Sequence, residues 1–560
     1  MALLKKKKKK LVIRSGGGGS SGAETSTRRP YQLEKDAPCM SACPQGTEIR
    51  SVLMTIAQAE KYERPQEDAF MDAWEILTKK NPLPATCGRV CPHPCEDACN
   101  RIGKDGALAI NNVERFIGDW GIEKNLPYKK LTDETQKEKV AVLGAGPAGL
   151  GCAYHLARQG YGVTIFEAFS KAGGMLRYGI PAYRLPHNIL DGEIQKILDL
   201  GVELKTNIAV GKDIPYEQVQ SEFDAIFVGI GAHKGKGLWL EGEDSANVFS
   251  GVGFLNQVNG GSPVEIGDKV VVIGGGDTAI DAARVALRLG SKEVTILYRR
   301  TRNEMPAIEE EIVGAEEEGI IFHFLAAPKE LVIEDGKVVK MECQQMELGE
   351  PDSSGRRRPV PIEGDTFTVE LTALIPAISQ EPDFEGLDNL HEGRDWVKVD
   401  DWGKTKEDKT YSGGDVLDLG LVTVALAQGK LAADTIHAQF RGIELKKAEP
   451  VPPASSDRML LNFYEKALRH ECESLPVEKR FDEMWTEISS TLPEADLIEE
   501  AKRCMSCGSC FDCGTCWSYC QDQAIIKPMV PGEPYKFKLE FCKGCDKCKE
   551  ACPCGYIEMK

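Results

Sequence analysis

The sequence has few of the features that mark membrane, secreted or hydrolytic proteins. Its 560 residues contain no run approaching the roughly 18 apolar residues that span a bilayer. After an early lysine run only residues 11–13 are apolar, which is far short of a secretory signal, so we expect a cytoplasmic protein. There are only 8 histidines, and no HExxH motif indicates a metallohydrolase.

Negative charge is in excess, but it is unevenly distributed. The formal net charge of −18 makes nucleic acid an improbable partner. Residues 1–30 carry nine Lys and Arg and one acid, a net of +8, so the remainder carries −26. A lysine run at 5–10 and a Gly/Ser segment at 15–22 indicate a disordered, solvated tail, with an electrostatic tether to an acidic partner as the alternative.

Cysteine is nearly absent from the long middle of the chain. Of 20 cysteines, 17 lie in three groups at 39–99, 504–520 and 542–554, which leaves only Cys152, Cys343 and Cys472 elsewhere. A disulfide framework would spread its cysteines over a small secreted domain. The clustering therefore predicts metal ligation in a reducing compartment.

The strongest structural pattern is a strand, a glycine turn, a helix and a second strand, which occurs twice. The first copy has strands at 140–143 and 163–166, and the second has strands at 270–273 and 294–297. Two such units predict a multidomain α/β protein with two Rossmann-like dinucleotide-binding lobes. The predicted domains are a tail (1–30), a helical iron–sulfur domain (31–135), a flavin lobe in two parts (136–260 and 371–445), an NAD(P)H lobe (261–370), a helical linker (446–500) and a ferredoxin-like domain (501–560).

The first glycine turn is a complete G-x-G-x-x-G, formed by Gly144, Gly146 and Gly149. It would place a pyrophosphate at a helix N-terminus, and Glu167 ends the next strand where an acid would bond ribose hydroxyls. A purely structural turn is the alternative. A glycine loop at 172–181 and a segment at 410–429 could reach a ring system. The further candidate residues in these segments are Gly174, Arg177, Gly414, Asp415, Thr423 and Val424.

The second glycine turn differs in the charge that follows it. Its next strand ends not in an acid but in Tyr298-Arg299-Arg300. Arginines pair with a 2′-phosphate, which an acid would repel, so we expect NADPH rather than NADH. The alternative is that these arginines face solvent or the acids at 309–311. The candidate NAD(P)H-binding residues are Gly274, Gly275, Gly276, Asp277, Thr278, Arg299 and Arg300.

Two runs near the C-terminus match the ferredoxin pattern C-x2-C-x2-C-x3-C, in which the fourth cysteine crosses to the other cluster. Zinc sites use separated C-x2-C pairs instead. Gln521 replaces the proline that usually follows the first run, and Cys504, Cys507 and Cys554 remain unassigned. The crossed pattern predicts one [4Fe–4S] cluster on Cys510, Cys513, Cys516 and Cys552, and another on Cys542, Cys545, Cys548 and Cys520.

The N-terminal group also indicates iron–sulfur ligation. Six cysteines cannot hold two all-cysteine cubanes, so one cluster is expected and a second would need other ligands. These six cysteines are Cys39, Cys43, Cys87, Cys91, Cys95 and Cys99.

Residues from about 39 to 440 resemble the small subunit of bacterial glutamate synthase and its relatives. The matching motifs are the Cys87-Gly-Arg-Val-Cys-Pro segment, both glycine turns, the Tyr298-Arg-Arg segment and Ser412-Gly-Gly-Asp. The resemblance implies FAD in the first lobe and NADPH in the second. It also implies one cluster on Cys43, Cys91, Cys95 and Glu114, and a second on Cys39, Cys99 and further cysteines, although none precedes Cys39.

The ferredoxin-like tail resembles a subgroup that feeds dedicated reductases, such as dissimilatory sulfite reductase or benzoyl-CoA reductase systems. We therefore expect an NAD(P)H oxidoreductase that exchanges hydride with FAD and passes single electrons through clusters to a protein partner, with no separate catalytic side chain. That partner would be ferredoxin, a reductase or a synthase subunit, and the chain could also form a homodimer. The alternatives are the small subunit of a glutamate synthase-type complex, which supplies electrons for 2-oxoglutarate amination, and a non-catalytic electron-wiring scaffold.

Overall fold

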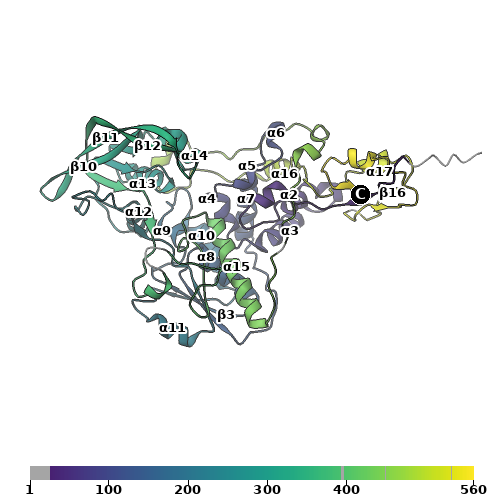
Figure 1. Ribbon diagram of the computed structural model, residues 1–560, viewed down its shortest axis with the longest axis horizontal. Helices are drawn as coiled ribbons and strands as arrows, with labels where there is room; N and C mark the ends of the chain where they lie inside the picture. Colours follow the sequence, from purple (N-terminus) through teal and green to yellow (C-terminus); the bar gives the residue numbers. More distant parts are fainter. Residues whose placement is uncertain (1–24, 392–395, 448, 531) are drawn as a thin grey trace, which may run out of the picture. The chain divides into compact units, whose positions relative to one another are not determined.

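The computed structural model describes residues 25–391, 396–447, 449–530 and 532–560 (Figure 1). The predicted basic tail lies mostly outside these residues, because the description begins at residue 25. The chain forms two compact bodies. The larger contains residues 36–453 and 465–506, and the smaller contains the described residues up to 35 together with 454–464 and 507–560. Among the described residues, no helix combines the length and apolar character needed to cross a bilayer.

The larger body begins with a helical layer that carries the first cysteine group. Proline stands at the first turn of α1, α4 and α5, where its missing N–H costs nothing. Helices α4 and α7 can pack closely because Gly88 has no side chain. A Cβ there would lie only 2.4 Å from the backbone nitrogen of Arg115. The helices are α1 (Pro38–Ala42), α2 (Ile49–Ala57), α3 (Gln66–Thr78), α4 (Pro84–Val90), α5 (Pro94–Asp97), α6 (Ile102–Asp105) and α7 (Ile110–Glu123).

The first dinucleotide lobe is a parallel sheet in the order β15-β5-β2-β3-β4. The predicted strands at 140–143 and 163–166 are confirmed as β2 (Lys139–Leu143) and β3 (Gly162–Glu167), and β15 (Thr410–Ser412) returns from far along the chain. The remaining elements are β4 (Glu203–Thr206), β5 (Ala225–Val228), α8 (Pro147–Arg158), α9 (Met175–Tyr178), α10 (His187–Leu198), α11 (Tyr216–Glu222) and α15 (Val422–Arg441).

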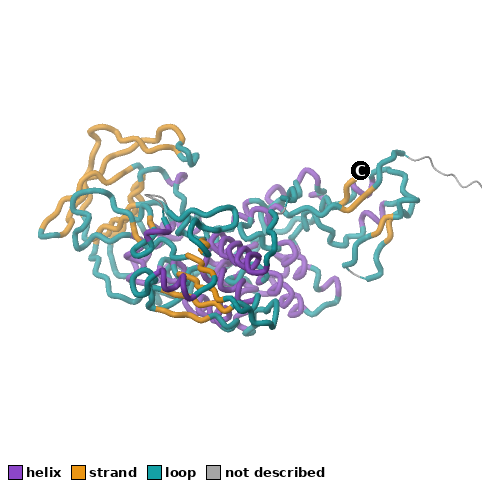
Figure 2. The backbone as a smooth tube through the Cα atoms, turned by 60° about the horizontal axis from the view of Figure 1, so that its bottom comes forward, coloured by secondary structure: helices purple, strands orange, loops and turns teal. Residues whose placement is uncertain are grey.

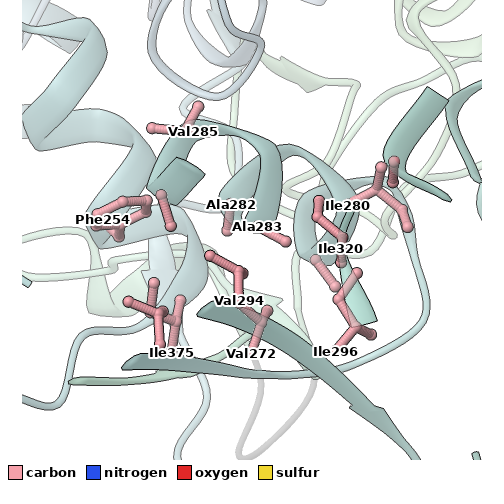
Figure 3. Close-up of a cluster of buried hydrophobic side chains, with 14 of the residues drawn as sticks. Phe254, Val272, Ile280, Ala282, Ala283, Val285, Val294, Ile296, Ile320 and Ile375 are labelled. Atoms are coloured by element: carbon pink, nitrogen blue, oxygen red, sulfur yellow. The ribbon is translucent and has the colours of Figure 1, made fainter. Parts of the chain in front are cut away.

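The second lobe repeats the plan with a parallel sheet in the order β13-β7-β8-β9. Its core packs Val272, Val294 and Ile296 of the sheet against Ile280 and Phe254 of the covering helices (Figure 3). The elements are β7 (Lys269–Ile273), β8 (Glu293–Tyr298), β9 (Ile321–Phe324), β13 (Ala373–Pro376), α12 (Gly251–Asn259), α13 (Asp277–Arg288) and α14 (Glu309–Glu317).

A three-stranded antiparallel sheet, seen as the long orange stretches of tube in Figure 2, extends this lobe. It consists of β10 (Ala326–Glu334), β11 (Lys337–Pro351) and β12 (Arg357–Glu370). The chain leaves the flavin lobe at β6 (Lys234–Gly235) and returns at β14 (Gln380–Glu381), and these two strands pair. The second lobe therefore extends on both sides of the expected 261–370, because α12 and β13 complete its core.

The segment after α15 was predicted to be a helical linker, and this prediction is wrong for most of its length. The described residues contain short 3-10 turns at Ser456–Arg458, Leu461–Phe463 and Val477–Phe481, and one α-helix, α16 (Glu494–Lys502). Prolines at 450, 452, 453, 476 and 493 remove backbone donors and interrupt any longer helix.

The smaller body is built from three separate stretches of chain. Strand β1 (Pro30–Gln32) pairs antiparallel with β18 (Ile557–Met559), so residues 30–35 belong with the C-terminal cysteines and not with the helical layer as expected. The remaining elements are α17 (Thr515–Tyr519), β16 (Ile525–Ile526), β17 (Lys536–Phe537) and α18 (Lys547–Glu550).

Candidate redox centres

Four side chains named as ligands surround one small cavity in the helical layer. Cys43 and Cys91 are the residues that end α1 and α4, Cys95 lies in α5, and Glu114 lies in α7. Gln45 lines the same cavity, and neither atom of its buried amide has a hydrogen-bond partner among the described residues. Such an orphaned amide, beside three thiols and a carboxylate, fits a site that holds a polar or ionic group.

Burial dominates the electrostatics of this cavity. It raises the pKa of Glu114 to about 7, against a smaller lowering by Asn81, whose amide donates to Glu114 at 2.8 Å. Burial, followed by the Glu114 charge, raises the pKa of Cys91 to about 11. Apolar surroundings thus disfavour free thiolates, and a bound cation would reverse that balance.

Not every predicted cysteine reaches this cavity. Cys87 is fully buried in α4 but lies outside the lining, with its thiol 3.7 Å from the Asn81 oxygen. Cys39 and Cys99 each stand one helical turn from a lining cysteine and are also outside it. Glu193 of α10, which sequence reasoning missed, holds α4 in place by accepting from the amides of Ala85 and Thr86 at 2.6 and 3.0 Å.

A cavity of about 510 Å³ lies at the carboxyl edge of the flavin-lobe sheet, where α/β proteins bind ligands. His233 lines it, and its buried Nδ1 has no partner among the residues that the structure describes. Burial lowers the pKa of this imidazole to about 4, so it is neutral. Of the candidate flavin-binding residues, those that line the cavity are Gly144, Gly146, Glu167, Gly174, Gly414 and Asp415.

The first glycine turn is shaped by close backbone approaches. A Cβ on Gly149 would lie 1.9 Å from the Gly144 oxygen, so only glycine lets α8 start this close to β2. A Cβ on Gly146 would meet only Gly174, at 3.9 Å, so its open side faces the cavity. Glu167 accepts from the amides of Ala145 and Phe169 at 2.7 and 2.8 Å, and burial raises its pKa.

The other candidates of the flavin lobe lie elsewhere. Arg177 is buried outside the lining, where it donates to the Ala172 carbonyl at 2.6 Å and to Asp191. Thr423 lines the cysteine cavity instead, with its hydroxyl 3.9 Å from the Cys91 sulfur. Val424 packs half-buried near Gly420.

The second glycine turn is equally tight. A Cβ on Gly274 would lie 2.4 Å from the Ala377 oxygen, and one on Gly275 would lie 2.5 Å from the Tyr298 ring. Gly276 has open space beside it, with only Pro306 at 3.9 Å. Asp277 and Thr278 begin α13 and line the flavin-lobe cavity.

The two arginines that follow β8 differ from each other. Arg299 is exposed. Arg300 is buried, and it donates to Asp352 at 2.7 Å and to the Arg357 carbonyl at 2.8 Å. We expected both arginines to pair with a 2′-phosphate. Arg299 could do so directly, whereas Arg300 would first have to break its ion pair with Asp352.

A buried ion pair that sequence reasoning missed joins the two lobes. Arg184, from the flavin lobe, lies 2.7 Å from Asp281 of α13 and 3.0 Å from Glu311 of α14. Arg184 and Asp281 also line the flavin-lobe cavity. Since burying unpaired charges is costly, this contact fixes α13 against the cavity wall.

In the smaller body, two cavities gather the ferredoxin-type cysteines. One is lined by Cys510, Cys513, Cys516 and Cys552, with Cys554 beside them, and the other by Cys520, Cys542, Cys545 and Cys548. Each thus combines three cysteines of one run with the fourth of the other. Amides of Ala524 and Tyr556 donate to the sulfurs of Cys520 and Cys552, both at 3.3 Å.

No three His, Cys, Asp or Glu side chains in the described ranges form the compact group that would hold a single metal ion. Amide donors to cysteine sulfur are also a usual feature of iron–sulfur sites, where they tune the reduction potential.

Comparison with known proteins agrees with these features. The family described as pyridine nucleotide-disulphide oxidoreductase matches residues 138–429, and the one described as dihydropyrimidine dehydrogenase domain II, 4Fe-4S cluster, matches residues 18–126. The β subunit of NADPH-Fe(3+) oxidoreductase from Geobacter sulfurreducens is 37% identical over 535 residues, covering 86% of this chain and 77% of the relative.

Two further relatives share the same core. The β subunit of NADP(+)-dependent formate dehydrogenase from Moorella thermoacetica is 41% identical, over 72% of this chain and 60% of its own. The small chain of NADPH glutamate synthase from Escherichia coli K12 is 35% identical, over 66% of this chain and 83% of its own. The chain therefore belongs to the iron–sulfur flavoproteins of the pyridine nucleotide-disulphide oxidoreductase family and is an NAD(P)H-dependent oxidoreductase.

Proposed function

We propose that this chain takes electrons from NADPH and delivers them, through FAD and a series of [4Fe–4S] clusters, to a redox protein partner. The observation that carries the proposal is the position of Cys91. Its neighbours Val90 and Pro92 form part of the wall of the flavin-lobe cavity, while Cys91 itself lines the cysteine cavity. One residue of backbone thus separates the two compartments.

The proposed role of the residues in the flavin-lobe cavity is to bind FAD and the nucleotide and to orient them toward each other. When bound, FAD supplies the exchange between two-electron hydride chemistry and single-electron transfer. Gly146 would admit the pyrophosphate to the N-terminus of α8, and Glu167 would offer its carboxylate to ribose hydroxyls. Asp277 and Thr278, at the start of α13, line the same cavity, so a nucleotide bound by the second lobe would lie next to it.

Cys91 also has a direct contact to the flavin lobe, through the hydroxyl of Thr423 at the start of α15. We assign the first cluster to Cys43, Cys91, Cys95 and Glu114, and two more to the cysteine sets of the smaller body. The partner is proposed to be another subunit of a redox complex, since the relatives are named as a β subunit or a small chain of such complexes.

An anaerobic NADPH titration of the full chain tests this function. NADPH should bleach the flavin absorbance and then produce EPR signals of reduced clusters. Cys91→Ser should lose the signal of the N-terminal cluster, whereas the control Cys343→Ser, a buried cysteine of β11, should behave as wild type. The proposal fails if NADPH does not bleach the flavin, or if the cluster signals of Cys91→Ser equal those of Cys343→Ser.

A further inference from the structure

Cys99 lies outside the cysteine cavity, in a loop whose backbone amides point at its sulfur. It follows α5, and the backbone amides of Leu108 and Arg101 both donate to its sulfur. The guanidinium of Arg503 and the carboxylate of Glu96 also lie close enough to interact with this thiol. Cys39 occupies a related place in α1, which packs against α5.

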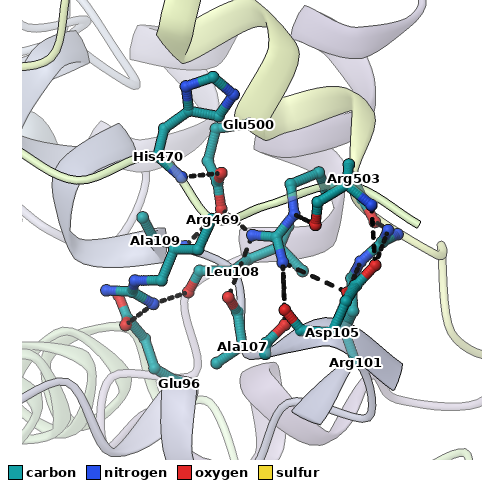
Figure 4. Close-up of polar contacts among 12 residues, drawn as sticks. Glu96, Arg101, Asp105, Ala107, Leu108, Ala109, Arg469, His470, Glu500 and Arg503 are labelled. Carbon is teal, nitrogen blue, oxygen red and sulfur yellow. Dashed lines mark hydrogen bonds and ion pairs between the residues drawn. The ribbon is translucent and has the colours of Figure 1, made fainter. Parts of the chain in front are cut away.

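Hydrogen bonds join the loop that follows Cys99 to the end of α16, a helix nearly 400 residues later in the chain (Figure 4). The guanidinium of Arg503 donates to the carbonyls of Ala107 and Gly106 at 3.1 and 3.0 Å. In the opposite direction, the guanidinium of Arg101 donates to the Arg503 carbonyl. That carbonyl carbon is bonded directly to the nitrogen of Cys504, so Cys504 is held beside the Cys99 loop.

The same clamp is buried and is built around an ion pair. Glu500 is 0% exposed and Arg503 is 2% exposed, and they are 2.6 Å apart. Glu500 also accepts from the amides of Ala109 and His470, at 2.7 and 2.9 Å. Burying this many charges contributes little net stability, so its main physical effect is to fix the position of the residue that follows. The Cys504 amide completes the turn by donating to Ala501 at 3.0 Å.

We propose that Cys504 is a ligand of a second iron–sulfur cluster in the larger body, which it shares with Cys99 and Cys39. This inference rests on the proposed function, because it takes the N-terminal cysteines to be cluster ligands. The proposal accounts for the shortage of N-terminal cysteines. Cys43, Cys91 and Cys95, with Glu114, would bind the first cluster, and the 465–506 segment of the larger body would supply a thiol for the second. Cys504 accordingly belongs to this body and not to the ferredoxin-type ladder that it extends in the sequence.

Iron and acid-labile sulfide analysis of full chains purified anaerobically tests the assignment. Cys504→Ser should lose one [4Fe–4S] cluster's worth of iron and sulfide and one EPR component. The matched control is Cys472→Ser, which removes another half-buried cysteine of the same 465–506 segment. Retained FAD absorbance shows that each variant is folded. Equal iron in Cys504→Ser and Cys472→Ser would overturn the proposal.

Double variants show which cluster is lost. Cys99→Ser should lose the same cluster, so the Cys99→Ser/Cys504→Ser protein should contain no less iron than either single variant. Cys504→Ser/Cys510→Ser should lose two clusters' worth. The reverse pattern, with additive loss in the first pair and none in the second, would place Cys504 on a ferredoxin-type cluster and refute the assignment. Flavin bleaching by NADPH in wild type tests the proposed function separately, because it does not depend on the iron count.

Discussion

The two dinucleotide lobes share a backbone plan and differ in the charges placed on it. In the flavin lobe, β3 ends in Glu167, which turns back to its own glycine turn and accepts from backbone amides. In the second lobe, β8 ends in Tyr298, whose ring covers Gly275, and an exposed arginine follows. From this difference we expect the end of the second strand, rather than the glycine turn, to distinguish the nucleotides that the two similar lobes accept.

The largest effect should come from filling the two turns separately. Gly146→Val places a side chain in the open space where a pyrophosphate must approach, so the purified protein should contain no FAD. Gly276→Val fills the equivalent space of the second lobe, and it should keep FAD while losing NADPH-dependent bleaching. Flavin absorbance and NADPH titration provide the measurements. If Gly146→Val protein is still yellow and its flavin is still bleached by NADPH, the two turns do not have the separate roles that we predict.

The buried carboxyls of the lobes should respond to pH in opposite directions. Burial would raise the pKa of Glu318, but Arg284 and Arg288 hold it at about 2. The stability that Glu318 contributes is therefore present above its ordinary pKa of 4.5 and lost as the pH falls toward 2. Glu167 has a raised pKa, so its contribution is present at low pH and lost as the pH rises through its folded value.

Glu318→Gln should accordingly destabilise the second lobe at neutral pH by about 3–5 kcal/mol, because two buried arginines lose their partner. Hydrogen exchange of β7 and β8 measures the loss locally. The difference in the stability of the second lobe between the variant and wild type should shrink as the pH falls below about 4.5. A difference that does not change with pH would show that the carboxylate charge is unimportant there.

Nucleotide choice should depend on one arginine of the pair. Arg299→Ala should reduce the preference for NADPH over NADH by about tenfold, or about 1.4 kcal/mol, because an exposed cation is lost. Arg300→Ala should instead loosen its contact with Asp352 and leave the preference nearly intact. The ratio of kcat/KM for the two nucleotides separates these outcomes. If Arg300→Ala changed this kcat/KM ratio more than Arg299→Ala, the nucleotide preference would depend on Arg300 and not on Arg299.

The smallest effect should be a change in potential at the boundary between flavin lobe and helical layer. Thr423→Val removes the hydroxyl that contacts the Cys91 sulfur, so the reduced, more negative state of a cluster there loses stabilisation. The midpoint potential of the N-terminal cluster should move downward, while the signals of the other clusters stay unchanged. A redox titration followed by EPR measures it, with Thr435→Val, from the same helix, as the control.

The sequence predicted those parts of the fold that depend on local pattern. The four strands flanking the glycine turns were predicted to within one residue at each end, because buried parallel strands form short apolar runs bounded by glycine. Thr423 was assigned to the wrong cavity, since the direction of α15 is set by tertiary packing. The partner of Arg300 lies 52 residues away in a β-hairpin, and the clamp on Cys504 spans most of the chain. Neither long-range contact has a signal in the local sequence.

The pairing of β1 with β18 gives the protein an unusual order of assembly. Tyr31 lies opposite Glu558, 527 residues later, so the earliest described strand to be synthesised stays without its partner until that much more of the chain has been translated. Both nucleotide lobes can form and bind their cofactors before that time. The smaller body, in contrast, cannot be completed until β18 has been synthesised. We therefore expect its cysteines to be enclosed later than those of the helical layer, and to acquire iron and sulfide later as well.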